Sequence, residues 1–280
     1  MHRPYVEGSR HRRPYGGPPE APRRLTHMTR IAPGTTLTVQ QIADLVDHAL
    51  LKPELTPREI AQGVAEVAAL NAWSVCVRPS DVPAVAKQLA GQYSKVCTVL
   101  GFPHGTTSTA AKVAEARQAI ADGAVELDMV LNIGRLRGGA VDDVREDIAA
   151  VVAAGHEGGA LVKVIFETAL LDEGEKVDAC RAAADAGADF VKTSTGFAGG
   201  GATVADILLM AANVPDRVSV KASGGVRDVE TALAMVAAGA TRIGTSSTAD
   251  ILDGARRLAE AGRLVVPAPD RTAAAAAPGY

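Results

Sequence analysis

The feature that most constrains the fold of this chain is a regular alternation of short apolar runs and longer amphipathic segments. Eight runs rich in Val, Ile and Leu are predicted to be β-strands, at residues 47–51, 73–77, 95–102, 125–132, 161–167, 190–194, 218–223 and 242–247. Segments such as 57–71, 107–123 and 226–240 place apolar residues at three- and four-residue spacing, which is typical of amphipathic helices. A further helix is predicted at 38–49, before the first strand.

Eight βα units in about 230 residues predict a (β/α)8 barrel, an α/β fold of the TIM-barrel type, here with an extra N-terminal helix. An open doubly wound sheet alternates in the same way, but no GxGxxG follows the first strand and the count of eight is complete. Aromatic residues make up only 3% of the chain. A core of Ala, Val, Leu and Ile suits a parallel sheet buried under helices, so we favour the barrel.

The two ends of the chain differ from the middle. Residues 1–34 are rich in Arg, Pro and Gly and have little periodic apolar content, so we expect a disordered arm, with Met28 as an alternative start. Residues 266–280 are Ala-rich and are predicted to be a flexible tail, which leaves 35–265 for the barrel. The net charge of -3 argues against a nucleic-acid partner.

The three cysteines, Cys76, Cys97 and Cys180, cannot all pair, and none lies in a CxxC. Neither a disulfide framework nor a zinc site is indicated, and Cys76 and Cys97 are predicted to be small core residues. No apolar run reaches the roughly 18 residues of a membrane span, and the arginine-rich start lacks the apolar stretch of a secretory signal. We therefore expect a cytoplasmic protein with no membrane partner.

Two lysines lie one βα unit apart in matching settings, Lys192 in VKTSTG and Lys221 in VKASGG. Both are near the C-terminal ends of predicted strands, where barrels of this type carry their chemistry. A lysine must be neutral to attack a carbonyl, and an ordinary lysine is neutral in about one molecule in 2,500 at pH 7. Burial and a second ammonium both favour the neutral amine, so the pair predicts a Schiff-base nucleophile. Taken singly, each could instead be a lysine that reaches solvent.

The fourth predicted strand places Glu126 and Asp128 on one face, with Asp128 nearer the barrel mouth. A carboxylate at that position could move protons or hold an ammonium. The alternative is a buried acid paired with a strand lysine such as Lys163, and the sequence leaves both open. Lys163 lies early in its own strand, which favours an internal ion pair.

Glycines and small hydroxyl residues follow the last three predicted strands: Gly196, Gly224, Gly225, Ser246 and Ser247. The loops after strands seven and eight are where (β/α)8 barrels usually bind phosphate, through backbone N–H groups and a helix N-terminus. We therefore predict a phosphorylated substrate.

Other polar residues give weaker signals. His104 is predicted to satisfy loop backbone, while Asp47 and His48 could support the barrel floor or contribute to the site. No group of His or carboxylate residues has metal-ligand spacing, so we expect neither a metal nor a cofactor.

Eight motifs follow one another within residues 38–265: DHALLKP (47–53), SVCVRPS (74–80), VCTVLGFPHG (96–105), ELDMVLNIG (126–134), VKVIFET (162–168), VKTSTGF (191–197), KASGGVR (221–227) and GTSS (244–247). Together they resemble the deoxyribose-phosphate aldolases, class I aldolases of the (β/α)8 fold. The resemblance implies that Lys192 forms the Schiff base and that Asp128 and Lys221 donate and accept protons. Lys221 would also favour the neutral amine of Lys192.

The resemblance further implies a metal-independent lyase of deoxyribose phosphate catabolism. It would reversibly cleave 2-deoxy-D-ribose 5-phosphate to D-glyceraldehyde 3-phosphate and acetaldehyde, and we expect a homo-oligomer, a dimer or a tetramer. Three positions depart from the family pattern: Ala49 where Thr is usual, Arg78 where Asn is frequent, and Phe197 where some relatives carry a phosphate-holding Lys. Tyr280 matches a terminal Tyr that reaches the active site in some relatives.

Two other functions stay open. A lysine aldolase of the transaldolase or larger-sugar type would share the barrel and the Schiff base but accept a ketone donor. A non-catalytic barrel that binds phosphosugars would hold its ligand without covalent chemistry.

Overall fold

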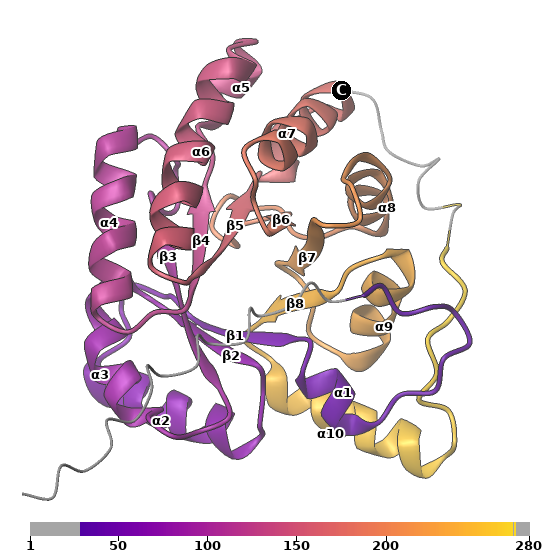
Figure 1. The fold of residues 1–280 in the computed structure, drawn as a ribbon. Coiled ribbons are helices and arrows are strands. Elements are labelled where there is room, and N and C mark those ends of the chain that lie inside the picture. Colours follow the sequence, from indigo (N-terminus) through magenta and orange to yellow (C-terminus); the bar gives the residue numbers. More distant parts are fainter. Residues whose placement is uncertain (1–28, 271, 273–280) are drawn as a thin grey trace, which may run out of the picture.

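The computed structural model describes residues 29–270 and 272, which form a closed barrel of eight parallel strands with helices around it (Figure 1). Each strand pairs with the next in chain order, and β1 also pairs with β8. The strands are β1 Val46–Leu50, β2 Ser74–Val77, β3 Lys95–Leu100, β4 Glu126–Val130, β5 Leu161–Ile165, β6 Phe190–Lys192, β7 Ser219–Ser223 and β8 Arg242–Thr245. The predicted (β/α)8 fold is confirmed.

The helices cover the outside of the barrel (Figure 1). They are α1 Val39–Ala43, α2 Pro57–Ala69, α3 Val82–Gln88, α4 Thr109–Ala121, α5 Ile133–Arg137, α6 Val141–Glu157, α7 Glu173–Asp185, α8 Val204–Asn213, α9 Val229–Ala238 and α10 Thr248–Glu260, with 3-10 turns at Pro79–Asp81 and Thr168–Leu170. The extra N-terminal helix is present as α1, but it is shorter than the predicted 38–49. The residues after Ala43 lead into β1, which forms hydrogen bonds with strands on both sides.

Six of the eight strands end before the predicted runs do, and β2 and β7 end where the runs end. In the runs 95–102 and 161–167 the backbone turns at Gly101, with φ of 58°, and at Glu167, with φ of 60°. Both values are left-handed, a conformation that does not continue a strand. The last residues of these runs therefore form loops that follow the C-terminal ends of the strands.

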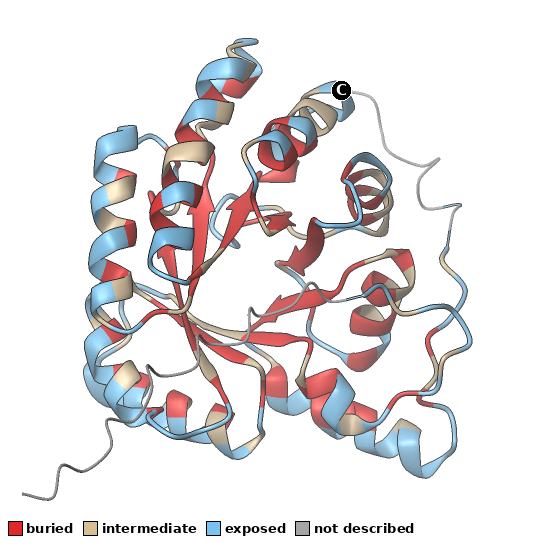
Figure 2. Cartoon of the chain, viewed as in Figure 1, coloured by how far each residue is buried: buried red, intermediate tan, exposed pale blue. Residues whose placement is uncertain are grey.

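Apolar residues of the strands and of the inner helix faces form the core (Figure 2). In α2, the buried residues Ile60, Val64 and Val67 follow the spacing expected of an amphipathic helix. The helix begins with a capping box between Thr56 and Glu59. Each buried aliphatic side chain contributes roughly 1.5–3 kcal/mol to stability, so the core holds the strand ends in fixed positions.

The first and last described segments lie side by side. Thr36 and Val265 form an antiparallel bridge, and the N–H of Gly34 donates to the carbonyl of Val266 at 2.8 Å. Val266 is almost fully buried. The predicted boundaries at residues 34 and 266 therefore fall within segments that contact the barrel.

Most of the predicted arm and tail, including Met28 and Tyr280, lies outside the described residues.

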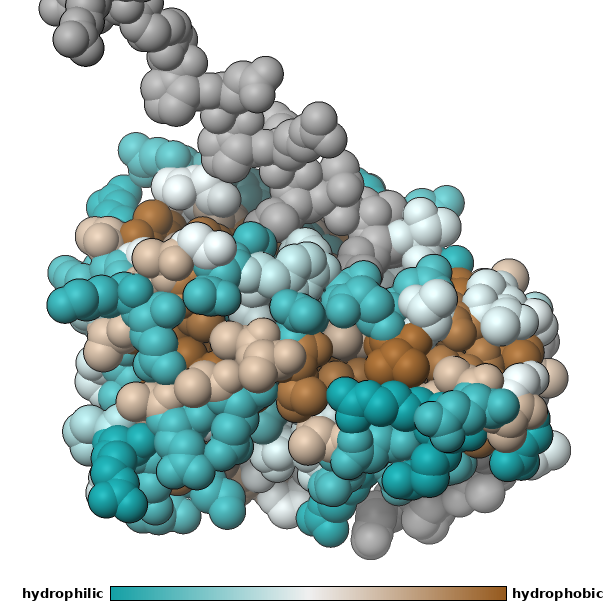
Figure 3. Space-filling model, turned by 90° about the horizontal axis from the view of Figure 1, so that it is seen from below, coloured by the Kyte–Doolittle hydropathy of each residue, from teal (hydrophilic) through white to brown (hydrophobic). Residues whose placement is uncertain are grey.

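From below, the face around α1, α2 and α10 shows a central band of apolar residues among hydrophilic ones (Figure 3). In the described part of the chain, no helix is long and apolar enough to cross a membrane.

Candidate active site

Two lysines and one aspartate meet inside the barrel, toward the C-terminal ends of the strands. Lys192 ends β6, and Lys221 lies beside it on β7 as its register partner. Asp128 reaches both from β4, and its Oδ2 lies 2.8 Å from the Nζ of each lysine. All three residues are buried. The structure thus brings together the three residues that the sequence singled out as catalytic.

Lys163, on β5, contacts the same aspartate from the other side. Its Nζ lies 2.7 Å from Asp128 Oδ1 and 2.5 Å from Glu126 Oε2. Asp128 therefore fits both alternatives that the sequence left open, a carboxylate in contact with the site lysines and a buried acid paired with Lys163. It pairs with Lys163 through one oxygen and contacts Lys192 and Lys221 through the other.

The charges in this cluster stabilise one another. Burial alone would raise the pKa of Asp128, but the ammonium groups of Lys163, Lys192 and Lys221 hold it well below its usual value. Burial would likewise lower the pKa of Lys221, but the carboxylates of Asp128 and Asp47 outweigh burial and raise it. At neutral pH Asp128 is an anion and Lys221 is a cation. The sequence prediction of a Schiff-base lysine relied on repulsion between Lys192 and Lys221. The carboxylate of Asp128 offsets that repulsion.

Asp47, Glu126 and Arg242 form a second layer of charged side chains. This layer lies next to the layer of lysines and Asp128, toward the N-terminal ends of the strands. Asp47 Oδ2 lies 2.5 Å from Lys221 Nζ, and Asp47 Oδ1 accepts a hydrogen bond from Arg242 Nη1 at 2.8 Å. Arg242 begins β8, and its Nη1 also lies 3.2 Å from Glu126 Oε2. Asp47 therefore belongs to the barrel floor and also contacts a site lysine, so it joins the two layers.

Arg242 lies between two aromatic rings. Its guanidinium carbon is 4.9 Å from the ring centroid of Trp73 and 5.3 Å from that of Phe190. Trp73 Nε1 also donates to Glu126 Oε1 at 2.6 Å. The sequence analysis does not single out Arg242, because the barrel rule points to strand ends and this residue is at a strand start. The available signal was an arginine inside a predicted buried strand.

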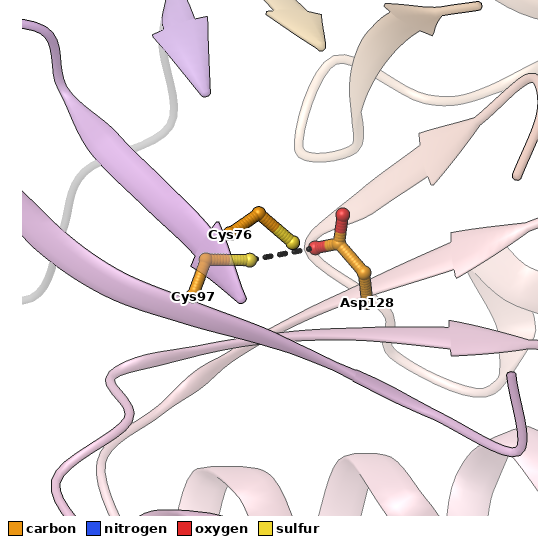
Figure 4. A group of neighbouring side chains, drawn as sticks. All are labelled: Cys76, Cys97 and Asp128. Carbon is orange, nitrogen blue, oxygen red and sulfur yellow. Dashed lines mark hydrogen bonds between the residues drawn. The ribbon is translucent and has the colours of Figure 1, made fainter. Parts of the chain in front are cut away.

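Cys76 and Cys97 approach Asp128 from β2 and β3 (Figure 4). Both cysteines are buried, as predicted for core residues, and the Sγ of Cys97 also donates to Asp128 Oδ1 at 3.3 Å. The three ligand atoms lie within 4.8 Å of one another, a grouping that sequence spacing did not reveal. Burial raises the pKa of Cys97 well above its usual value, which disfavours its thiolate, whereas the hydrogen bond with Cys97 lowers the pKa of Cys76. Both oxygens of Asp128 are already in contact with the amines of three lysines, so we assign no metal to this group.

A cavity of about 970 Å³ opens at the C-terminal end of the barrel, and both Lys192 and Lys221 line it. The predicted phosphate-binding residues that line it are Gly196, Gly224, Gly225 and Ser246. Ser247 is not among the lining residues, and its backbone N–H donates to Thr245 Oγ1 at 2.9 Å.

Two glycines allow the loops after β6 and β7 to pack closely. A Cβ on Gly201 would lie 2.5 Å from the carbonyl oxygen of Gly224, and Gly224 itself has a φ of 86°. Beyond Gly225, the exposed Arg227 also lines the cavity. No role was given to Arg227 from the sequence, although its place just after the two glycines was a usable signal.

The two histidines singled out in the sequence occupy different settings. His48 Nδ1 lies 2.8 Å from Thr248 Oγ1, which links β1 to the start of α10. Burial lowers the pKa of His48 to about 4, so its ring is neutral at pH 7. His104 is exposed and is not among the residues that line the cavity.

The three positions that depart from the family pattern differ in whether they line the cavity. Ala49 and Phe197 line the cavity, and the ring of Phe197 packs edge-on against that of Phe102 at 5.3 Å. Arg78 is outside the lining. Its guanidinium pairs with Asp81 at 2.6 Å and donates to backbone carbonyls of the loop after β1.

Comparisons with known proteins place the chain in one family of aldolases. Residues 42–253 match the family described as DeoC/LacD family aldolase. The chain is 55% identical over 211 residues to the deoxyribose-phosphate aldolase of Brevibacillus brevis, a match that spans 75% of this chain and 95% of that protein. It is 53% identical to that of Staphylococcus epidermidis, with 76% and 96% covered. The tetrameric deoxyribose phosphate aldolase of Aeropyrum pernix superimposes with a TM-score of 0.74 at 31% identity, covering 79% of this chain and 93% of that one.

Proposed function

Because this chain belongs to the DeoC/LacD aldolase family, we propose that it reversibly cleaves 2-deoxy-D-ribose 5-phosphate to D-glyceraldehyde 3-phosphate and acetaldehyde. One observation carries the proposal. Asp128 Oδ2 lies within hydrogen-bond distance of two lysine amines, Lys192 and Lys221, at the base of a cavity large enough for a sugar phosphate. This arrangement supports Schiff-base formation with proton transfer beside it.

Lys192 is the proposed nucleophile. Its neutral amine attacks the aldehyde carbon of the open-chain sugar, and loss of water from the resulting carbinolamine gives an iminium. When the hydroxyl on the third carbon loses its proton, the bond between the second and third carbons breaks. Its electron pair moves toward the iminium and forms an enamine, while D-glyceraldehyde 3-phosphate leaves. Protonation of the enamine and hydrolysis then release acetaldehyde and restore Lys192.

Asp128 and Lys221 are the proposed proton carriers. Asp128 is an anion that contacts the nucleophile, so it is placed to accept a proton during carbinolamine formation. Lys221 is a cation next to it and can return a proton through the shared carboxylate.

Replacement of Lys221 by Met should lower kcat/KM by about 100-fold, since one proton carrier is lost. Removal of a neighbouring ammonium also favours the protonated form of Lys192, so the acid limb of the pH–rate profile should move to higher pH. The measurement is kcat/KM across pH. A variant with the wild-type profile would remove Lys221 from both roles.

The proposed phosphate site is the mouth side of the cavity, where Gly196, Gly224, Gly225 and Ser246 supply backbone and hydroxyl donors. Ser247 was predicted with them and stays a candidate through its place before α10. The guanidinium of Arg227 adds positive charge at the same edge.

Ser246→Asp should raise KM for deoxyribose 5-phosphate by about tenfold or more, because a carboxylate would repel the phosphate. KM for unphosphorylated deoxyribose should stay near the wild-type value, since that substrate has no anion to repel. Steady-state kinetics with both substrates check this, and Ser246→Ala serves as the uncharged control. Equal changes for the two sugars would place the phosphate elsewhere.

We further propose that the protein is a homo-oligomer of the cytoplasm. The Aeropyrum pernix relative is described as tetrameric, and the three cysteines of this chain are free and buried, which suits a reducing compartment. Light scattering on the purified protein would give the mass of the assembly.

Reduction of a mixture of protein and deoxyribose 5-phosphate with borohydride tests the whole proposal. A stable adduct on Lys192, located by peptide mapping, is the expected result. Binding of the sugar without an adduct would favour a non-catalytic phosphosugar-binding barrel. Stronger competition by a ketose donor than by deoxyribose 5-phosphate would favour another type of lysine aldolase.

A further inference from the structure

Charged side chains line the substrate cavity in two separate places. Asp47, Lys192 and Lys221 are buried at its base, within the layers of charge described above. Lys52 and Arg227 line the same cavity but are exposed, so they belong to its outer part. Among the described residues that line the cavity, these five are the only Lys, Arg, Asp and Glu. Both charged side chains of the outer part are therefore cations.

The two outer cations come from loops on either side of the loop after β8. β8 pairs with β7 and with β1, so the loops that follow these three strands are neighbours at the mouth. Thr245 Oγ1 donates to the carbonyl of Val226 at 2.7 Å, next to Arg227 in the chain. On the other side, His48 Nδ1 lies 2.8 Å from Thr248 Oγ1. The three loops thus form one continuous side of the mouth, with one outer cation on the first loop and the other on the last.

The outer cations are available to an anion. In the part of the chain that the structure describes, neither Lys52 nor Arg227 has a carboxylate oxygen within 4 Å of its charged nitrogens. The other donors of the proposed phosphate site are neutral, since they are backbone N–H groups and the hydroxyl of Ser246. A phosphate monoester carries roughly two negative charges at pH 7. Two cations beside the loop after β8 match that charge.

Arg78 holds the loop of Lys52 from outside the cavity. Its Nη1 donates to the carbonyl of Lys52 at 3.2 Å and to that of Pro53 at 3.0 Å. Its Nε lies 2.6 Å from Asp81 Oδ2, so the guanidinium is itself held in place. The carbonyl of Lys52 also accepts from the N–H of Leu55 at 3.3 Å. The backbone that carries Lys52 is therefore fixed before a ligand binds, which lowers the entropic cost of the contact.

We propose that Lys52 is a specificity-determining residue that holds the substrate phosphate together with Arg227, and that Arg78 is a positioning residue for Lys52. Arg78 is not among the residues that line the cavity, so it acts through the loop backbone. This inference rests on the proposed function and deepens it, because it assigns the preference for a phosphorylated sugar to one side chain. The phosphate is at the opposite end of the sugar from the carbon that Lys192 attacks. The contact should therefore act on binding and not on the chemical step.

Substitutions of Lys52 should change KM according to charge. Lys52→Met should raise KM for deoxyribose 5-phosphate about fivefold with kcat near the wild-type value, because a charged contact is lost from substrate and transition state alike. Lys52→Arg keeps the charge and should stay within about twofold of wild type. Lys52→Glu places a like charge beside the phosphate and should raise KM about 30-fold. The inhibition constant of inorganic phosphate should rise in the same order.

Two controls accompany these variants. KM for unphosphorylated deoxyribose should stay near the wild-type value in all three, since that sugar has no anion to hold. Lys87→Met removes an exposed lysine of α3 and should leave KM for both sugars unchanged, which accounts for the loss of one positive charge elsewhere on the surface. Lys52 is exposed, so its variants should fold.

A double-variant comparison tests the role of Arg78. Arg78→Met should raise KM for deoxyribose 5-phosphate about threefold and leave kcat and the KM for deoxyribose unchanged. The variant with both Lys52→Met and Arg78→Met should have the KM of Lys52→Met alone, because Arg78 acts through Lys52. Effects that multiply in the double variant would overturn the positioning role.

The inference on Lys52 is overturned by a Lys52→Glu variant with the wild-type KM for deoxyribose 5-phosphate. An equal rise in KM for both sugars overturns it as well. Failure of the proposed function has a different result, which is wild-type protein with neither turnover nor a borohydride adduct. The two failures are distinguishable because each Lys52 variant is compared with a wild type that cleaves the substrate.

Discussion

Lys192→Ala should lower the rate of deoxyribose 5-phosphate cleavage by at least about 10⁴-fold, toward the uncatalysed background. The covalent route needs an amine at this position, and the other lysines of the cluster are each held by at least two carboxylates. Borohydride trapping should disappear together with turnover. Both are measured on the same preparation, by a coupled assay for D-glyceraldehyde 3-phosphate and by intact mass.

Two controls sharpen this result. Lys192→Arg keeps a positive charge next to Asp128 but cannot form the Schiff base, so it should be as inactive as the alanine variant. Lys87→Ala removes an exposed lysine of α3 and should keep wild-type activity. Turnover that survives in Lys192→Ala would mean that another residue is the nucleophile.

Asp128→Asn should lower kcat by about 10³-fold, the second large effect that we expect. The amide cannot accept a proton, and the substitution removes the negative charge that the amines of three lysines contact. Unpaired buried charge should also lower the melting temperature. The measurement is kcat at saturating substrate, together with a thermal melt that verifies that the variant is folded under assay conditions.

The chain offers a matched control for this variant. Asp147 is another buried aspartate, paired with Lys112 at 2.6 Å between α4 and α6 and outside the cavity. Asp147→Asn should lower stability in a similar way and leave kcat unchanged. If both variants lost kcat in proportion to stability, Asp128 would be a structural residue and not a proton carrier.

The order of elements in this fold could be predicted because strands buried on both faces appear as short apolar runs between amphipathic helices. The ends of most strands could not, because they depend on local backbone conformation. Glu167 takes a left-handed φ that the sequence gives no reason to expect of a glutamate. Similarly, the segment after Ala43 satisfies a helical pattern, but pairing with two neighbouring strands outweighs it.

Residues at strand ends were predictable as site candidates, since strand alternation and the barrel rule place Asp128, Lys192 and Lys221 toward the same opening. The contacts between individual side chains were not. That Cys97 donates to Asp128 depends on the register of β3 against β4, and that Arg242 contacts Asp47 depends on the register of β8 against β1. Such contacts need coordinates, because no spacing in the sequence encodes them.

The bridge between Thr36 and Val265 brings the beginning and the end of the barrel segment side by side. Since β1 also pairs with β8, the sheet has no edge, and the chain that leaves the last helix returns to where the chain enters the first. If residues 1–33 and 267–280 were removed, a short peptide would suffice to cyclise the backbone there, and it would restrict the unfolded state without disturbing the interior. The βα units have an order along the sequence, but none of them occupies an end position in the closed barrel. An exposed loop between two units could therefore serve as the start of a permuted chain.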